Sequence, residues 1–218
     1  MNAKEFYNSL VSLVSNQLKQ NDSAHDLSHS KRVLSVALEI SKENGEIDEI
    51  VLIASSLLHD ICEKVIKESK PKISFKKAKT ILENYSQFLN LDQIKKIKDS
   101  IVNHSFSVGK IPQTLEGKIL QDSDRIDALG ASGIARVFAI CGERKSSFYH
   151  DQDPFCENGR SLDDKNYTVD HFYTKLFKLK DTLHTEKAKE IAEKRIQFMK
   201  QYLDQFRSEI SLNIEEKI

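Results

Sequence analysis

The stretch IVLIASSLLHDICE, residues 50–63, decides the fold class of this chain. Its apolar residues cover most of a helical surface rather than one stripe, so the pattern predicts a helix through the centre of the fold. The pair His59 and Asp60 lies near the end of this run, among mostly apolar neighbours. Because an unpaired carboxylate is expensive to bury, we expect a cationic partner for Asp60.

Outward from this stretch, apolar residues recur every three or four positions along most of the chain. The pattern predicts further helices over residues 3–19, 30–40, 73–88, 91–104, 115–142, 168–183 and 188–206. Thr185 is a suitable N-cap for the last of these. The expected fold class is therefore all-α.

The domain organisation follows from the length and from one polar segment. A chain of 218 residues is long enough for one large domain or two small ones. Residues 146–166 are polar and weakly periodic, and a loop of this length is usually mobile or functional, either a lid over a pocket or a disordered excursion. The tail over residues 168–211 is too short for a large core of its own, so we expect one domain over residues 1–218.

The composition excludes several classes of protein. Lys+Arg and Asp+Glu both number 33, so the chain lacks the basic field of a general nucleic-acid binder. Three cysteines without a CxxC pair argue against a disulfide framework and favour a reducing compartment. No 18 apolar residues run together, and the N-terminal residues have no continuous apolar core. We expect a cytoplasmic protein that does not span a membrane, and an exposed apolar helix face would allow a homodimer.

The His-Asp pair is suited to binding a metal ion. His59 and Asp60 lie about 100° apart around a helix and can converge on one ion. A stable site needs donors from other helices. The best candidates are His29 and one of Asp122, Asp124 and Asp127. Mixed imidazole and carboxylate donors suit one divalent ion, Mn, Fe, Co, Ni or Mg, with positions left open for water. A hydrogen-bonded structural histidine or a capping aspartate is the alternative for each residue alone.

These residues resemble the signature of the HD-domain metal-dependent phosphohydrolases, which is a His, a His-Asp pair and a distant Asp. Here the positions are filled by His29, His59, Asp60 and Asp124. Four segments, HDLSHSKRV, LLHDICE, LEGKILQDSDRIDALGASGIARVF and DHFYTKLFKLKDTLHTEKAKEIAEKR, are similar to the compact bacterial HD proteins of the YpgQ and YedJ type, over about residues 24–206. The resemblance implies an all-α HD helical bundle in which these four residues bind one metal ion between helices. Asp122 and Asp127 are then left to support ligands or cap helices.

The resemblance also suggests a catalytic carboxylate. Some nucleotide-cleaving relatives place one three residues after the Asp of the pair, where this chain has Glu63. We interpret Glu63 as the residue that activates or orients water, next to Asp60 at the metal ion. A solvated surface glutamate is the alternative interpretation.

Phosphate chemistry also requires cationic side chains that hold the leaving phosphate. The candidates are Arg32, Lys64, Lys67, His104, Arg125, Lys175 and Lys178. Lys175 and Lys178 are expected to share a helix face at positions i and i+3. His104 could bind phosphate, donate a proton or extend the site to a second metal ion.

The predicted function is metal-dependent hydrolysis of a small phosphorylated metabolite, and the resemblance implies that this metabolite is a nucleotide. Nucleoside triphosphate pyrophosphohydrolysis is the favoured reaction. A nucleoside monophosphate phosphatase is the close alternative, separable by the release of orthophosphate instead of pyrophosphate. A non-catalytic HD module that binds a metal ion or nucleotide is the alternative from another class, and an inert helical interaction domain would bind no metal ion.

Overall fold

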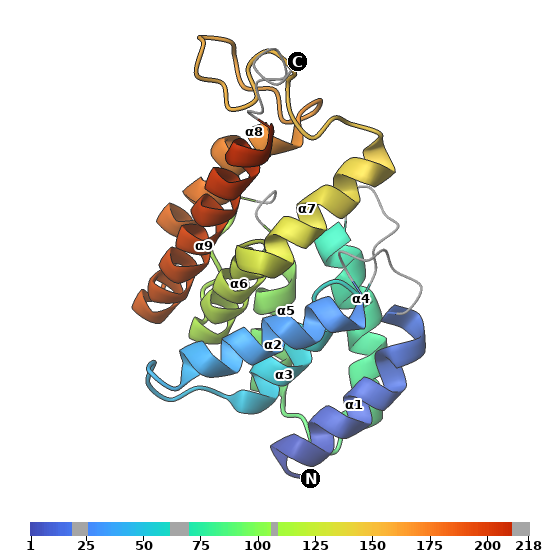
Figure 1. Ribbon diagram of the computed structural model, residues 1–218. Coiled ribbons are helices and arrows are strands. Elements are labelled where there is room, and N and C mark those ends of the chain that lie inside the picture. Colours follow the sequence, from blue (N-terminus) through green and yellow to red (C-terminus); the bar gives the residue numbers. More distant parts are fainter. Residues whose placement is uncertain (19–25, 62–69, 106–108, 211–218) are drawn as a thin grey trace. The chain divides into compact units, whose positions relative to one another are not determined.

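A computed structural model describes residues 1–18, 26–61, 70–105 and 109–210 (Figure 1). Within these ranges the chain is helical, and an isolated bridge between Ser147 and Tyr167 is its only β-type pairing. The α-helices are α1 (Ala3–Leu18), α2 (Leu27–Ser41), α3 (Glu49–Leu58), α4 (Lys70–Leu82), α5 (Leu91–Asn103), α6 (Leu115–Asp127), α7 (Gly130–Arg144), α8 (Thr168–Thr174) and α9 (Glu186–Ile210). Two 3-10 helices are η1 (Glu83–Tyr85) and η3 (Leu176–Thr182). The all-α prediction is confirmed.

The chain divides into two compact units. The first comprises Met1–Asp127 and Thr182–Lys189, and the second comprises Ala128–Asp181 and the chain from Glu190 onward. Helices α1 to α6 belong to the first unit, and α7, α8 and most of α9 belong to the second. The single domain expected from the sequence stays a prediction. None of the described helices is long and apolar enough to cross a membrane.

Helix α3 forms the centre of the first unit, as its apolar composition predicts. Every residue from Val51 to Leu58 is buried, and α3 packs against α1, α2, α5 and α6. Asp48 caps its start by accepting the backbone N–H groups of Ile50 and Val51 at 3.0 and 3.2 Å. Because α3 packs against several helices, its last turn lies among neighbouring helices.

Two predicted helices are wrong in length because the backbone breaks within them. The helix expected over residues 115–142 is two helices, α6 and α7, and Gly130 at the break has φ of 75°. A Cβ at Gly133 would lie 2.2 Å from the Ala128 carbonyl oxygen, so this turn requires glycine. The helix expected over residues 168–183 is also interrupted, at Lys175, which has non-helical dihedral angles.

The polar loop over residues 146–166 is held within the second unit by a buried carboxylate. Asp170 accepts hydrogen bonds from Arg160 Nη1 and Nη2 at 2.6 and 2.7 Å, and from the Asp163 N–H at 2.7 Å. Arg160 Nε also donates to the Asp153 carbonyl at 2.8 Å. These bonds hold the loop against α8, and its role as a lid stays a prediction.

Candidate metal centre

Three helices of the first unit bring predicted ligands together. His29 is the third residue of α2, and the Asp26 carboxylate caps that helix by accepting the His29 N–H at 2.8 Å. His59 is the C-cap residue directly after α3, and Asp124 lies in the last turn of α6. Because each side chain begins on a packed helix, its position is set by the core rather than by a loop.

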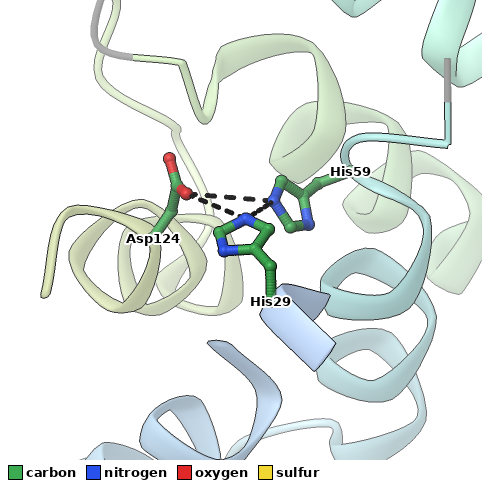
Figure 2. A group of neighbouring side chains, drawn as sticks. All are labelled: His29, His59 and Asp124. Carbon is green, nitrogen blue, oxygen red and sulfur yellow. Dashed lines mark hydrogen bonds and ion pairs between the residues drawn. The ribbon is translucent and has the colours of Figure 1, made fainter. Parts of the chain in front are cut away.

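The side chains of His29, His59 and Asp124 point toward one another (Figure 2). His29 Nε2 lies 3.1 Å from His59 Nε2 and 3.5 Å from Asp124 Oδ1, and His59 Nε2 lies 3.9 Å from the same oxygen. Both imidazoles are fully buried, whereas the Asp124 side chain is 24% exposed. The cluster is therefore closed on the histidine side and accessible at the carboxylate.

Hydrogen bonds at the other nitrogen of each ring fix its tautomer. His29 Nδ1 lies 2.8 Å from Asp127 Oδ2, and His59 Nδ1 lies 2.8 Å from the Ser56 carbonyl oxygen. Since both partners are acceptors, each Nδ1 carries a proton and each neutral ring keeps its lone pair at Nε2. Two lone pairs that face each other at 3.1 Å repel unless a cation lies between them.

This donor set fits a divalent metal ion. Two imidazole nitrogens that bind one ion at right angles, each at about 2.1 Å, are about 3 Å apart. The distance between the two Nε2 atoms is 3.1 Å, and Asp124 adds an oxygen donor. Neutral imidazole and carboxylate are the ligands that Mn, Fe, Co, Ni and, for oxygen-rich sites, Mg accept.

Asp60 connects this cluster to His104. Asp60 Oδ2 lies 3.8 Å from His59 Nε2, and Asp60 Oδ1 lies 3.7 Å from His104 Nε2. His104 Nδ1 donates to the Ile101 carbonyl at 2.7 Å, which leaves Nε2 as the nitrogen on the Asp60 side. His59, Asp60 and His104 form a second group of donors close enough to hold a metal ion.

Asp127 orients His29. Its carboxylate accepts the His29 Nδ1 proton and is bound at both oxygens by Arg32, from Nε at 2.7 Å and from Nη2 at 3.0 Å. Burial favours the neutral acid, but the hydrogen bonds from His29 and Arg32 outweigh it and hold the pKa of Asp127 well below its usual range. An ionised carboxylate behind a ligand histidine fixes the ring and raises its basicity.

Burial and neighbouring charges set the protonation of the other groups. Burial lowers the pKa of His59 to about 4, so the ring is neutral at neutral pH and able to bind a metal ion. Burial also opposes protonation of His104, but the nearby Asp60 outweighs it and raises the pKa of His104. For Asp124, burial favours the neutral acid, whereas the surrounding histidines lower its pKa and keep it ionised.

Asp122 has a role different from that of Asp124. Its buried carboxylate accepts the N–H groups of His184 and Thr185 and the Thr185 hydroxyl, each at 2.9 Å. The Thr185 hydroxyl in turn accepts the Ala188 N–H at 3.4 Å, as an N-cap of α9 does. The N-cap role expected for Thr185 is confirmed, and Asp122 holds the backbone just before α9.

Some of the predicted phosphate-binding residues have protein partners, and others lie outside the described residues. Arg32 is paired with Asp127, and Arg125 Nη1 donates to the Thr182 carbonyl, so both have protein partners and their phosphate contacts stay predictions. Glu63, Lys64 and Lys67 lie outside the described residues.

Lys175 and Lys178 are exposed and belong to the second unit. Their expected placement on one face of one helix is wrong, because α8 ends at Thr174 and Lys178 lies in η3. Their role as phosphate ligands stays a prediction.

The pairing of Arg32 with Asp127 was not predicted from the sequence. The spacing contained a signal, because His29 and Arg32 lie at i and i+3 on α2, and Asp124 and Asp127 have the same spacing on α6. Each helix thus presents one predicted ligand and one residue of the Arg32–Asp127 pair on a single face.

Comparison with known proteins identifies the family. Residues 26–129 match the HD domain. The uncharacterized protein YpgQ of Bacillus subtilis (strain 168) is 30% identical over 201 residues, which cover 88% of each chain. The chain belongs to the HD-domain family. The HD match includes His29, His59, Asp60 and Asp124, and the predicted resemblance is confirmed.

Solved structures of HD-domain proteins share the fold over nearly the whole chain. An HD-superfamily hydrolase from Bacillus thuringiensis has a TM-score of 0.74 at 29% identity, covering 97% of this chain and 100% of the other. The Lin1889 protein from Listeria innocua has a TM-score of 0.74 at 30% identity, covering 97% and 99%. Bacillus subtilis YpgQ in complex with ADP has a TM-score of 0.73 at 26% identity, covering 97% and 98%.

Proposed function

We propose that this HD-domain protein is a metal-dependent phosphohydrolase that acts on a nucleotide, most specifically on a nucleoside triphosphate with release of pyrophosphate. The supporting observation is that the Nε2 atoms of His29 and His59 face each other at 3.1 Å while both Nδ1 protons are donated elsewhere. Asp60 and Asp124 add the negative charge that a divalent cation requires.

Two similar proteins support the reaction class and the substrate class. The Bacillus thuringiensis protein is an HD-superfamily hydrolase, and YpgQ was crystallised with ADP. We infer a small nucleotide as the partner of this chain, one divalent ion as its cofactor, and a cytoplasmic location. Homodimer formation stays a prediction.

The roles of the side chains follow from their contacts. The residues that would hold the ion are His29, His59, Asp60 and Asp124. When bound, a divalent ion lowers the pKa of water and neutralises phosphoryl oxygens. His104, whose raised pKa favours a proton at Nε2, is suited to bind a phosphoryl oxygen or to protonate the leaving group. Glu63 remains our candidate for orienting or deprotonating the attacking water.

The test is product analysis with the purified full chain, supplied in turn with Mn, Co, Ni, Fe or Mg and with a panel of nucleoside mono- and triphosphates. We expect pyrophosphate from triphosphates. Asp60→Asn should lower kcat/KM by at least about a thousandfold, because the buried cluster loses the charge shared between His59 and His104. Asp92→Asn, an exposed carboxylate in the first turn of α5, is the matched control and should retain activity.

The other outcomes separate the alternatives. Orthophosphate from monophosphates would assign a phosphatase. Metal uptake without turnover of any nucleotide would contradict nucleotide hydrolysis and favour the binding module. If the folded chain takes up no metal ion, the proposed metal centre is wrong.

A further inference from the structure

The second unit contains its own cluster of titratable side chains. A cavity of about 150 Å³ is lined by residues from α7, from the polar loop and from α8. Its charged and titratable nitrogen groups are Arg144, His171 and Lys175, and Asp164 is the single carboxylate among the described residues that line it. Typical small-molecule pockets enclose about 300–1,000 Å³, so this cavity suits one chemical group rather than a whole nucleotide.

His171 is held in a defined orientation at this cavity. Its Nδ1 lies 3.0 Å from Asp164 Oδ2, and the Thr174 hydroxyl donates to the same oxygen at 2.8 Å. The hydrogen bonds from Thr174 and His171 hold the pKa of Asp164 below its usual value, so the carboxylate is an acceptor and His171 Nδ1 carries the proton. Nε2 is then the ring nitrogen that can meet a ligand.

Lys175 and Arg144 both act electrostatically on His171. Burial lowers the pKa of His171, Asp164 opposes this, and the charges of Lys175 and Arg144 lower the pKa further. The ring is therefore neutral at neutral pH, and Arg144 and Lys175 bring positive charge to the described lining of the cavity, which suits an anionic ligand.

The helix dipole explains part of the placement of Arg144. Arg144 lies in the last turn of α7, where the helix dipole favours a cation. The dipole does not account for Lys175 and His171, which reach the same cavity from the end of α8. Moreover, no carboxylate of the described residues lies within ion-pair distance of Arg144.

We propose that this cavity binds a single anionic group of the phosphate class, with Arg144 and Lys175 supplying charge and His171 Nε2 supplying a hydrogen-bonding nitrogen. A free phosphate ion and the terminal phosphate of a nucleotide share this chemistry. The site is built from residues of the second unit alone and does not depend on the metal centre.

The test is an NMR titration of the full chain with inorganic phosphate at constant ionic strength, monitored at the His171 ring. We expect a saturable shift with a Kd of about 1 mM or tighter and a rise in the His171 pKa when phosphate binds. Arg144→Gln should weaken binding about tenfold, since a charge-assisted hydrogen bond is lost. Lys145→Gln removes a neighbouring exposed charge that does not line the cavity, and should change the Kd less than about twofold.

Further arms of the titration use ADP and adenosine. If ADP shifts the His171 signals at lower concentration than phosphate and adenosine does not shift them, the anion is a nucleotide phosphate. If phosphate binds as tightly as ADP, the site recognises the free anion, and both results support the proposal. The proposal is overturned if phosphate at about 10 mM, ten times a Kd of about 1 mM, causes no shift. It is also overturned if Lys145→Gln weakens binding as much as Arg144→Gln, or if adenosine shifts the signals as ADP does.

Discussion

The two units contain the same pairing of histidine with carboxylate but surround it with opposite charge. In the first unit, Asp127 accepts the Nδ1 proton of His29, and in the second, Asp164 accepts that of His171. His29 Nε2 faces another imidazole and the Asp124 carboxylate, whereas His171 lines a cavity with Arg144 and Lys175. The carboxylate behind each ring fixes its tautomer, and the neighbouring charges decide whether the site suits a cation or an anion.

The two pairings also differ in strength. Asp127 is 1% exposed and is bound through both oxygens by Arg32, while Asp164 is 36% exposed and has a hydroxyl as its second partner. Removing one member of a buried, charge-assisted pair costs more free energy than removing one member of a half-exposed pair. We therefore expect larger effects from substitutions behind His29 than from those behind His171.

The largest expected effect is on metal affinity. Asp127→Asn should weaken binding of Mn about 10- to 100-fold, because the amide no longer holds His29 in the tautomer that leaves Nε2 free for the ion. Isothermal titration with the metal ion measures this directly. Asp164→Asn is the matched control in the second unit and should leave the metal affinity unchanged. An equal loss of metal affinity in both variants would contradict the difference inferred between the two histidine-carboxylate pairs.

The grouping of His29, His59 and Asp124 could be predicted from the sequence because their types and spacing are set within single helices, and their role as metal ligands stays a prediction. His29, the His59-Asp60 pair and Asp124 each lie at or near a helix end whose apolar pattern is visible in the sequence, and the family resemblance selected Asp124 over its two acidic neighbours. The structure adds a reason for that selection, since Asp122 binds the backbone of the N-cap residue of α9 and Asp127 supports His29.

Contacts between distant segments were less predictable. The pairing of Arg32 with Asp127 spans 95 positions and cannot be read from periodicity. The breaks at Gly130 and Lys175 were missed because apolar residues recur on both sides of each break. The cavity in the second unit depends on how the end of α7 meets α8, which one-dimensional spacing does not specify.

The second-largest expected effect is on how the free energy of unfolding depends on pH. The pKa of Asp127 is held well below its usual range in the folded chain, whereas in an unfolded chain an aspartate has a pKa of about 3.9. The ionised carboxylate therefore stabilises the folded chain above about pH 4, and this contribution is lost as the pH falls toward the folded-state pKa. Urea unfolding of the metal-free chain should show wild type more stable than Asp127→Asn by about 2 kcal/mol near neutral pH.

That difference should shrink below about pH 4, because the unfolded wild-type chain then takes up a proton at Asp127 that the folded chain does not. Asp92→Asn, at an exposed position, should change the free energy of unfolding near neutral pH by less than about 1 kcal/mol. A difference between wild type and Asp127→Asn that stays constant with pH would mean that Asp127 acts through its shape and not through its charge.

The smallest expected effect tests what Arg32 does. Its side chain is 41% exposed and paired with Asp127, so Arg32→Gln should weaken metal binding only up to about fivefold, less than Asp127→Asn, with KM for the nucleotide nearly unchanged. Lys31→Gln, at the adjacent exposed position, controls for the lost charge. If Arg32 instead binds the substrate phosphate, Arg32→Gln should raise KM at saturating metal ion and leave the metal affinity unchanged. The two readouts therefore distinguish support of His29 from contact with the substrate, and the first result is expected because both Asp127 oxygens already bind the guanidinium.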